Sequence, residues 1–208
     1  VSPPPSAVVL TPEQLARMEA TNSAVVEARA EAMARYATGL SHQAQGNDAA
    51  ALAELYAAAL ADLAHDGLVV DLARQLVQSG QAEKARELLL KATAQPKAPG
   101  VYFALLGWAD QLLGRKAEAM AAAQKAVSLC PTNLAGYQVQ ANLHLADKQP
   151  EEALIILAQA ARQPGDAVFF IDLAELLLKC AAPLPPDNET NKARVLPVLD
   201  RARNLPLE

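Results

Sequence analysis

Three histidines and two cysteines are the residues of this chain best suited to binding a metal or performing nucleophilic catalysis. His42 and His144 occupy equivalent places three repeats apart in the periodic pattern described below, which on a stacked array means roughly tens of ångströms. They cannot share a metal, and we expect each to be a partly buried packing residue. His65 stands beside Asp66 in a predicted turn formed with Gly67, where we expect a capping or solvent-facing role.

Cys130 and Cys180 lie in different repeats at non-equivalent places, so their spacing favours neither a disulfide framework nor a metal site. We expect both to be buried free thiols that behave as small apolar residues. No metal is expected anywhere in the chain.

The sequence also lacks an arrangement of residues for catalysis. No nucleophile–base pair with an orienting group and no glycine-rich phosphate loop is present. The acidic pairs Glu151–Glu152 and Glu27 with Glu31 are explained by helix-dipole complementarity and solvation. The sequence therefore predicts a protein that is not an enzyme and that needs no cofactor.

Small residues recur every 34 positions along most of the chain. The three series are Gly46, Gly80 and Gly114; Ala51, Ala85, Ala119 and Ala153; and Ala58, Ala92, Ala126 and Ala160. A fixed period of this length indicates stacked supersecondary units, each of which buries its apolar face against the next. About five such repeats fit in 208 residues.

Composition predicts an all-α protein. Apolar residues make up 52% of the chain but aromatic residues only 4%, since alanine, the best helix former, supplies much of the apolar fraction. The net charge of −5 comes without a Lys/Arg cluster that could follow a phosphate backbone, so nucleic acid is not an expected partner. No apolar run reaches the roughly 18 residues that a transmembrane helix requires.

Turn residues divide the chain into four parts. Residues 1–10 form a proline-rich lead that we expect to be disordered, and residues 11–31 form a helical extension that begins near Pro12. This extension continues into the first repeat as one long helix, or as two helices broken near residues 21–23. Four in-register repeats span residues 32–165, with Gly80 and Gly114 as left-handed helix ends.

The fifth repeat, residues 166–208, is distorted. If Ala202 is the counterpart of Ala160, the step between them is longer than the period, and a proline-rich insertion at 183–190 accounts for the excess. The expected helices are 48–63, 69–79, 83–94, 102–113, 116–128, 135–146, 151–161, 168–181 and 191–204.

The third repeat resembles a tetratricopeptide repeat (TPR). Its matching residues are Phe103, Leu106 and Gly107, followed by Ala119, Ala126 and Pro131. In this register the small position of the first helix holds Gly39, Ala73, Gly107 and Ala141, whereas the fifth repeat has Glu175. Asp110 replaces the usual tyrosine of the third repeat. The resemblance implies a right-handed superhelical solenoid of antiparallel helix pairs, whose first helices line a concave groove.

The resemblance also implies which side chains face this groove. They are Tyr36, Leu40, Gln43, Val70, Arg74, Val77, Gln78, Ala104, Trp108, Gln111, Leu112, Gln138, Asn142, Leu145, Asp172, Leu176 and Lys179. Trp108 is the first candidate for a partner contact; the alternative is that it packs between repeats or against the N-terminal helix. Some family members clamp a terminal carboxylate, but Arg74, Asn142 and Lys179 lie in separate repeats, so no such clamp is expected.

The sequence predicts a non-catalytic protein–protein interaction scaffold whose groove binds a peptide or helical segment of another protein. One alternative is the recognition domain of a larger enzyme or of a secretion or envelope assembly machine. Another is a self-associating module that pairs through uncovered end faces at Val198 or Leu199.

The N-terminus, which starts at Val1, fits a mature chain after signal removal, a linker that follows an anchor, or a piece of a longer protein. This favours export to a bacterial cell envelope, with a cytoplasmic location also open. The identity of the partner protein is not encoded in any recognisable motif.

Overall fold

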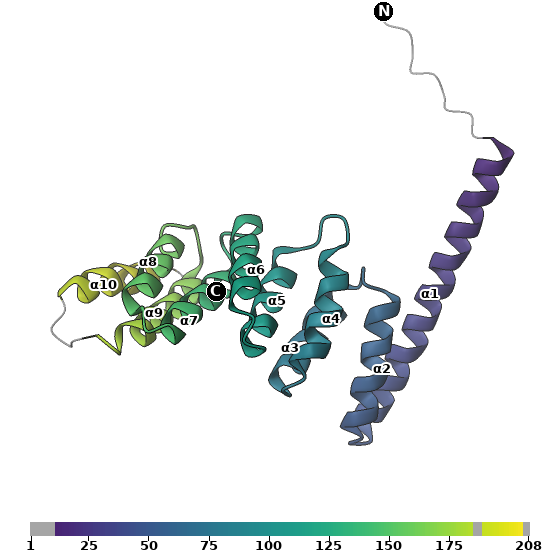
Figure 1. The fold of residues 1–208 in the computed structure, drawn as a ribbon, viewed down its shortest axis with the longest axis horizontal. Helices are drawn as coiled ribbons and strands as arrows, with labels where there is room; N and C mark the ends of the chain where they lie inside the picture. The colour runs from purple at the N-terminus through teal and green to yellow at the C-terminus, as the bar shows by residue number, and fades with distance from the viewer. Residues whose placement is uncertain (1–10, 185–188, 206–208) are drawn as a thin grey trace, which may run out of the picture. The chain divides into compact units, whose positions relative to one another are not determined.

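A computed structural model of the chain describes residues 11–184 and 189–205. These residues form ten α-helices and no strand (Figure 1), which confirms the all-α prediction. The helices are α1 (Pro12–Ala44), α2 (Asp48–Ala61), α3 (Asp66–Gln78), α4 (Ala82–Thr93), α5 (Gly100–Leu112), α6 (Lys116–Leu129), α7 (Leu134–Ala146), α8 (Pro150–Ala160), α9 (Ala167–Ala181) and α10 (Glu189–Arg203). The proline-rich lead and residues 185–188 of the predicted insertion lie outside the described residues. No helix of the described ranges has the length and apolarity to cross a membrane.

Two compact units make up the chain, an N-terminal unit of residues 1–65 and a C-terminal unit of residues 66–208. The N-terminal unit contains α1, which is one continuous helix without a break at 21–23, and α2. A Cβ atom on Gly39 would lie 2.8 Å from Cγ of Leu55. Arg35 pairs with Glu54 at 3.6 Å, while the earlier residue Arg29 pairs with the later Asp62, also at 3.6 Å. The two helices are therefore antiparallel.

The C-terminal unit stacks α3 to α10 in pairs that follow the chain (Figure 1). Each helix contacts the next one in sequence, and α3, α5, α7 and α9 also contact one another in succession. Among the described residues, no two second helices are in comparable contact. The first helices of the pairs therefore lie side by side and form one face of the unit.

Small residues allow the two helices of a repeat to approach closely. Ala73 and Ala141 are at most 1% exposed, and Gly107 is buried. A Cβ atom on Gly107 would lie 3.1 Å from the carbonyl oxygen of Ala119. These positions agree with the predicted register through the fourth repeat.

The register of the fifth repeat differs from the prediction. Helix α7 begins at Leu134, one full period after α5 begins at Gly100. Helix α9 begins at Ala167, which is one residue short of a full period after Leu134. Ala174, which is 2% exposed, therefore occupies the small position, and Glu175 is exposed. The placement of Glu175 at the small position was wrong, because α9 begins one residue earlier than the repeat period requires.

The same turn closes the first helix in four repeats. Gly80 and Gly114 have φ angles of 76° and 73°, as predicted for left-handed helix ends. Gly46 has φ 73° and Lys148 has φ 59° at the equivalent places. Two hydrogen bonds close each turn; in the fourth repeat the amide of Gln149 donates to the carbonyl of His144 at 2.9 Å. The predicted turn at 65–67 was wrong, since α3 already begins at Asp66.

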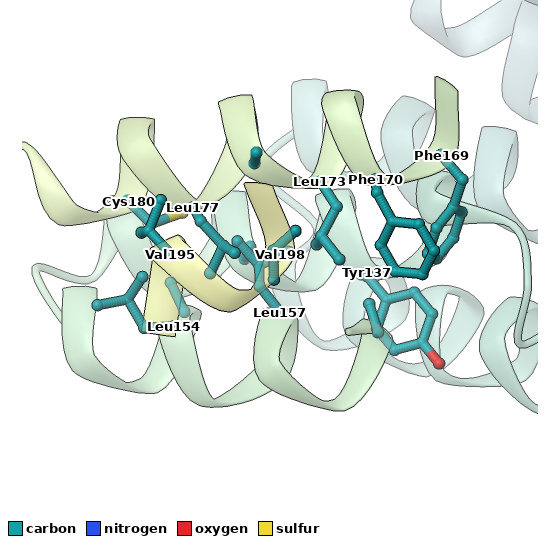
Figure 2. Packing of buried hydrophobic residues seen from close by; sticks show 14 of the residues in the cluster. Tyr137, Leu154, Leu157, Phe169, Phe170, Leu173, Leu177, Cys180, Val195 and Val198 are labelled. Carbon is teal, nitrogen blue, oxygen red and sulfur yellow. The ribbon is translucent and has the colours of Figure 1, made fainter. Parts of the chain in front are cut away.

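The last two repeats share one apolar core (Figure 2). Its labelled members are Tyr137, Leu154, Leu157, Phe169, Phe170, Leu173, Leu177, Cys180, Val195 and Val198. Val198 is 3% exposed, so its expected place on an uncovered end face was wrong, whereas Leu199 is 40% exposed. Cys180 is buried as expected, but Cys130 is only partly buried, with its sulfur 3.7 Å from Oγ1 of Thr132.

An ion pair with a buried carboxylate connects the second and third repeats. Nε of Arg86 on α4 donates to the carboxylate of Asp110 on α5 at 2.6 Å, and the Asp110 side chain is 3% exposed. A buried carboxylate needs such a partner, because removing one member of the pair leaves an uncompensated charge. This pair explains how an aspartate replaces the bulky residue expected there.

We expect Lys148→Gly to raise the free energy of unfolding by about 1 kcal/mol, because a non-glycine side chain is strained at this left-handed φ angle. Lys148→Ala keeps the Cβ atom and should bring no gain. Urea denaturation of the three proteins measures the difference. Equal stability of the glycine and alanine variants would contradict the strain.

We expect Arg86→Leu to lower the free energy of unfolding by about 3 kcal/mol, because it leaves the Asp110 carboxylate buried and unpaired. The double variant Arg86→Leu/Asp110→Leu should recover most of that loss. As a control, Lys116→Leu removes the exposed pair with Asp147 and should cost less than about 1 kcal/mol. A double variant no more stable than Arg86→Leu would rule out the proposed penalty.

Candidate functional site

A cavity of about 420 Å³ lies in the C-terminal unit on the face formed by the first helices. Its lining comes from α3, α5, α7 and α9 and from Asn133, the residue that caps α7. The lining residues are Arg74, Val101, Ala104, Leu105, Trp108, Asn133, Ala135, Gln138, Val139, Asn142 and Lys179. We call this space the inner cavity.

The floor of the inner cavity is apolar and belongs to the repeat interfaces. Ala104, Leu105 and Val139 are at most 5% exposed. Trp108 is half-buried and packs against a cluster that contains Ala119 and Val139. Trp108 therefore packs between repeats, which is the alternative weighed from the sequence, and it also lines the cavity.

The rim of the inner cavity is rich in hydrogen-bond donors. Arg74, Gln138 and Lys179 are exposed, and Nζ of Lys179 donates to Oδ1 of Asn142 at 3.4 Å. Arg74, Asn142 and Lys179 come from three different repeats, as the sequence indicated, yet they line one cavity. Their separation over three repeats therefore does not keep these side chains from lining the same cavity.

A second cavity of about 400 Å³, here called the acidic cavity, shares Gln138 and Lys179 with the first. Its other lining residues are Leu134, Asp172, Glu175 and Leu176. Asp172 and Leu176 were predicted groove residues. Glu175 was missed because the sequence register placed it between helices, and only the one-residue shift of α9 shows otherwise.

The remaining predicted groove residues line neither cavity. Val77 is buried at 4% exposure, and Leu112 is exposed at 54%. Val70, Gln111 and Leu145 are half-buried, and Gln78 is exposed. Tyr36, Leu40 and Gln43 are exposed on α1 of the N-terminal unit, where the Tyr36 ring lies 6.3 Å from the ring of His65. Asn133, Val101, Leu105, Ala135 and Val139 were not predicted.

A hydrogen bond between α3 and α5 positions two of the helices around the inner cavity. The hydroxyl of Tyr102, which is 1% exposed, donates to Oδ1 of Asp66 at 2.6 Å. Burial first, and then the bond to the Asp66 carboxylate, raises the pKa of Tyr102 well above its usual value near 10. The bond therefore requires a protonated Tyr102.

Residues suited to metal or nucleophile chemistry do not gather in the described ranges. No group of three His, Cys, Asp or Glu side chains there is arranged to hold a metal ion. His144 is half-buried, with Nδ1 3.1 Å from Oε1 of Gln149. Burial raises the pKa of the Cys180 thiol, which keeps it protonated and unreactive near neutral pH.

We expect stability to fall as the pH rises above about 10. The unfolded chain then ionises Tyr102 while the folded protein still holds it neutral, so alkali favours unfolding. Tyr102→Phe should lower stability by about 1 kcal/mol at neutral pH and should flatten the alkaline loss. Burial also raises the pKa of Tyr137, so some loss will remain. Denaturant midpoints of the wild-type protein and of Tyr102→Phe, measured across this pH range, test this prediction. Equal losses of stability in the two proteins would contradict the role of Tyr102.

Comparison with known proteins places the fold. No protein-family model and no curated protein sequence matches this chain. A crystal structure of MamA matches with a TM-score of 0.54 and 15% identity over 79% of this chain and 92% of MamA. The MamA RS-1 ArsTM double mutant matches with a TM-score of 0.55 and 15% identity over 84% and 97%. TTC0263, a thermophilic TPR protein of Thermus thermophilus, matches with a TM-score of 0.51 and 18% identity over 81% and 98%. The chain therefore has the fold of the tetratricopeptide-repeat proteins, an all-α solenoid of stacked helix pairs.

Proposed function

We propose that this chain is a non-catalytic protein-interaction scaffold whose inner cavity binds a peptide or helical segment of another protein. The observation that carries the proposal is the cavity of about 420 Å³, which combines an apolar floor with an exposed rim of cations and amides. Peptide-binding grooves have this composition, since the floor takes apolar anchors and the rim fixes their orientation.

Trp108 is the side chain on which such a ligand would pack. Tryptophan and arginine are enriched among the residues that carry most of the energy of an interface, and both occur in this lining as Trp108 and Arg74. The buried floor residues belong to the repeat interfaces, so the cavity is preformed. A preformed site loses little entropy on binding.

The chemistry of the lining supports binding rather than catalysis. It consists of Arg, Lys, amide, indole and aliphatic side chains. None of these forms a nucleophile–base pair of the kind used in group transfer. The TPR fold provides the same kind of support, because stacked repeats create extended surfaces for partner proteins.

The test places a photo-crosslinking amino acid at Gln138, on the rim of the inner cavity, or at Gln124, which is exposed on α6 outside its lining. We expect a partner from the native cells to crosslink from position 138 and not from 124. With that partner purified, Trp108→Ala should weaken binding by at least about tenfold.

Two controls accompany this test. Leu129→Ala removes a large exposed side chain of α6 and should leave affinity unchanged. Circular dichroism must show that the Trp108→Ala variant remains helical, because Trp108 also packs in the fold. Crosslinking from position 124 alone, or full affinity of a folded Trp108→Ala variant, would count against the proposal.

A further inference from the structure

We infer that the ligand of the inner cavity is an internal segment carrying an acidic side chain beside an aliphatic one, with a basic residue that lies at the acidic cavity. This inference rests on the proposed function and specifies the chemistry of the partner. It depends on the distribution of charge along the face formed by α3, α5, α7 and α9.

The two cations of the inner cavity form no ion pair among the described residues, although Lys179 also lines the acidic cavity with Asp172 and Glu175. No Asp or Glu lines this cavity, and the described residues show no ion pair of Arg74 or Lys179. By contrast, Arg86 and Lys116 of the same unit are paired with carboxylates of the chain. In a protein of net charge −5, two exposed cations beside one apolar cavity form a local site for an anion.

The amides of the lining add donors to these cations. Oδ1 of Asn142 accepts from Lys179, and Oδ1 of Asn133 accepts from the amide of Ala135 at 2.9 Å. The NH₂ group of each side chain therefore remains to donate to a ligand. A carboxylate, which only accepts hydrogen bonds when ionised, complements guanidinium, ammonium and amide donors together. The apolar floor accounts for the aliphatic neighbour.

The acidic cavity supports the second part of the inference, which is the basic residue of the ligand. It shares Gln138 and Lys179 with the inner cavity, so the two cavities adjoin and an extended chain can reach from one into the other. Asp172 and Glu175 line it, and both are exposed. These carboxylates disfavour a second acidic residue and favour a base. An internal segment with both charges fits this face better than a uniformly acidic tract.

The experiment selects binders from a random dodecapeptide library, fused through its C-terminus to a display protein so that no terminal carboxylate is free. We expect the enriched peptides to carry an acidic residue beside an aliphatic one, with a basic residue farther along. Arg74→Gln should weaken a synthetic, amidated version by about tenfold, since it removes a charged hydrogen-bond donor. A parallel library with free C-termini tests whether the bound carboxylate is that of a chain terminus. Stronger enrichment in that library would overturn the proposal of an internal segment.

Charge reversal supplies a positive readout. Arg74→Glu/Lys179→Glu should select peptides with a base in place of the acid, and Glu175→Lys should remove the preference for the second, basic residue. As a control, Lys84→Glu/Lys125→Glu changes the net charge by the same amount as Arg74→Glu/Lys179→Glu, but at exposed positions outside both cavities. This control should select the original peptides.

The outcomes separate this inference from the proposed function. Peptides that require Trp108 but carry no acidic residue, or that are unchanged by charge reversal, would overturn the inference and leave the groove scaffold standing. A basic preference that persists in Glu175→Lys would overturn the assignment of the acidic cavity. Failure of every library to yield a peptide that depends on Trp108 or Arg74 would overturn both.

Discussion

Close approach of helices at alanine and glycine positions is the constraint on which this solenoid depends. Within the third repeat, a Cβ atom on Gly107 would lie 3.1 Å from the carbonyl oxygen of Ala119. Between repeats, a Cβ atom on Gly136 would lie 2.9 Å from Cγ2 of Val127 and 3.0 Å from the carbonyl oxygen of Ala123. Backbones this close leave no room for large side chains, which explains a core rich in alanine in a chain with only 4% aromatic residues. Since each repeat buries its face only against its neighbours, such contacts must recur along the array.

Packing between alanine faces fixes the relative orientation of two helices less firmly than packing between interdigitated large side chains. Directional polar contacts fix this orientation instead. The Arg86–Asp110 pair connects α4 to α5, and the Tyr102–Asp66 hydrogen bond connects α5 to α3. Both contacts are at least partly buried. Their hydrogen-bond geometry is held because an unpaired polar group in such a place costs free energy. They fix α5, and with it Trp108, against the helix that carries Arg74.

Local and periodic features could be predicted from the sequence, whereas features that depend on stacking could not. The helix pairs and the glycine turns at Gly80 and Gly114 follow from patterns within one repeat. Lys148 was missed because its side chain type gives no sign of a left-handed backbone. The grouping of Arg74, Asn142 and Lys179 was missed for a different reason. Residues far apart in sequence converge here because each first helix contacts the next, and long side chains reach across that spacing.

The one-residue shift of α9 connects the packing of the fold to the charge of its inner face. With an unbroken period, Glu175 would lie at the small position between two helices, where burial of an unpaired carboxylate costs several kcal/mol. Because α9 begins one residue early, Ala174 lies there instead and Glu175 is exposed near Asp172. The same shift buries Leu177 and leaves Leu178 exposed at 55%. The demand for a small residue at the helix contact therefore determines where these carboxylates lie, and so gives the inner face its two adjoining regions of opposite charge.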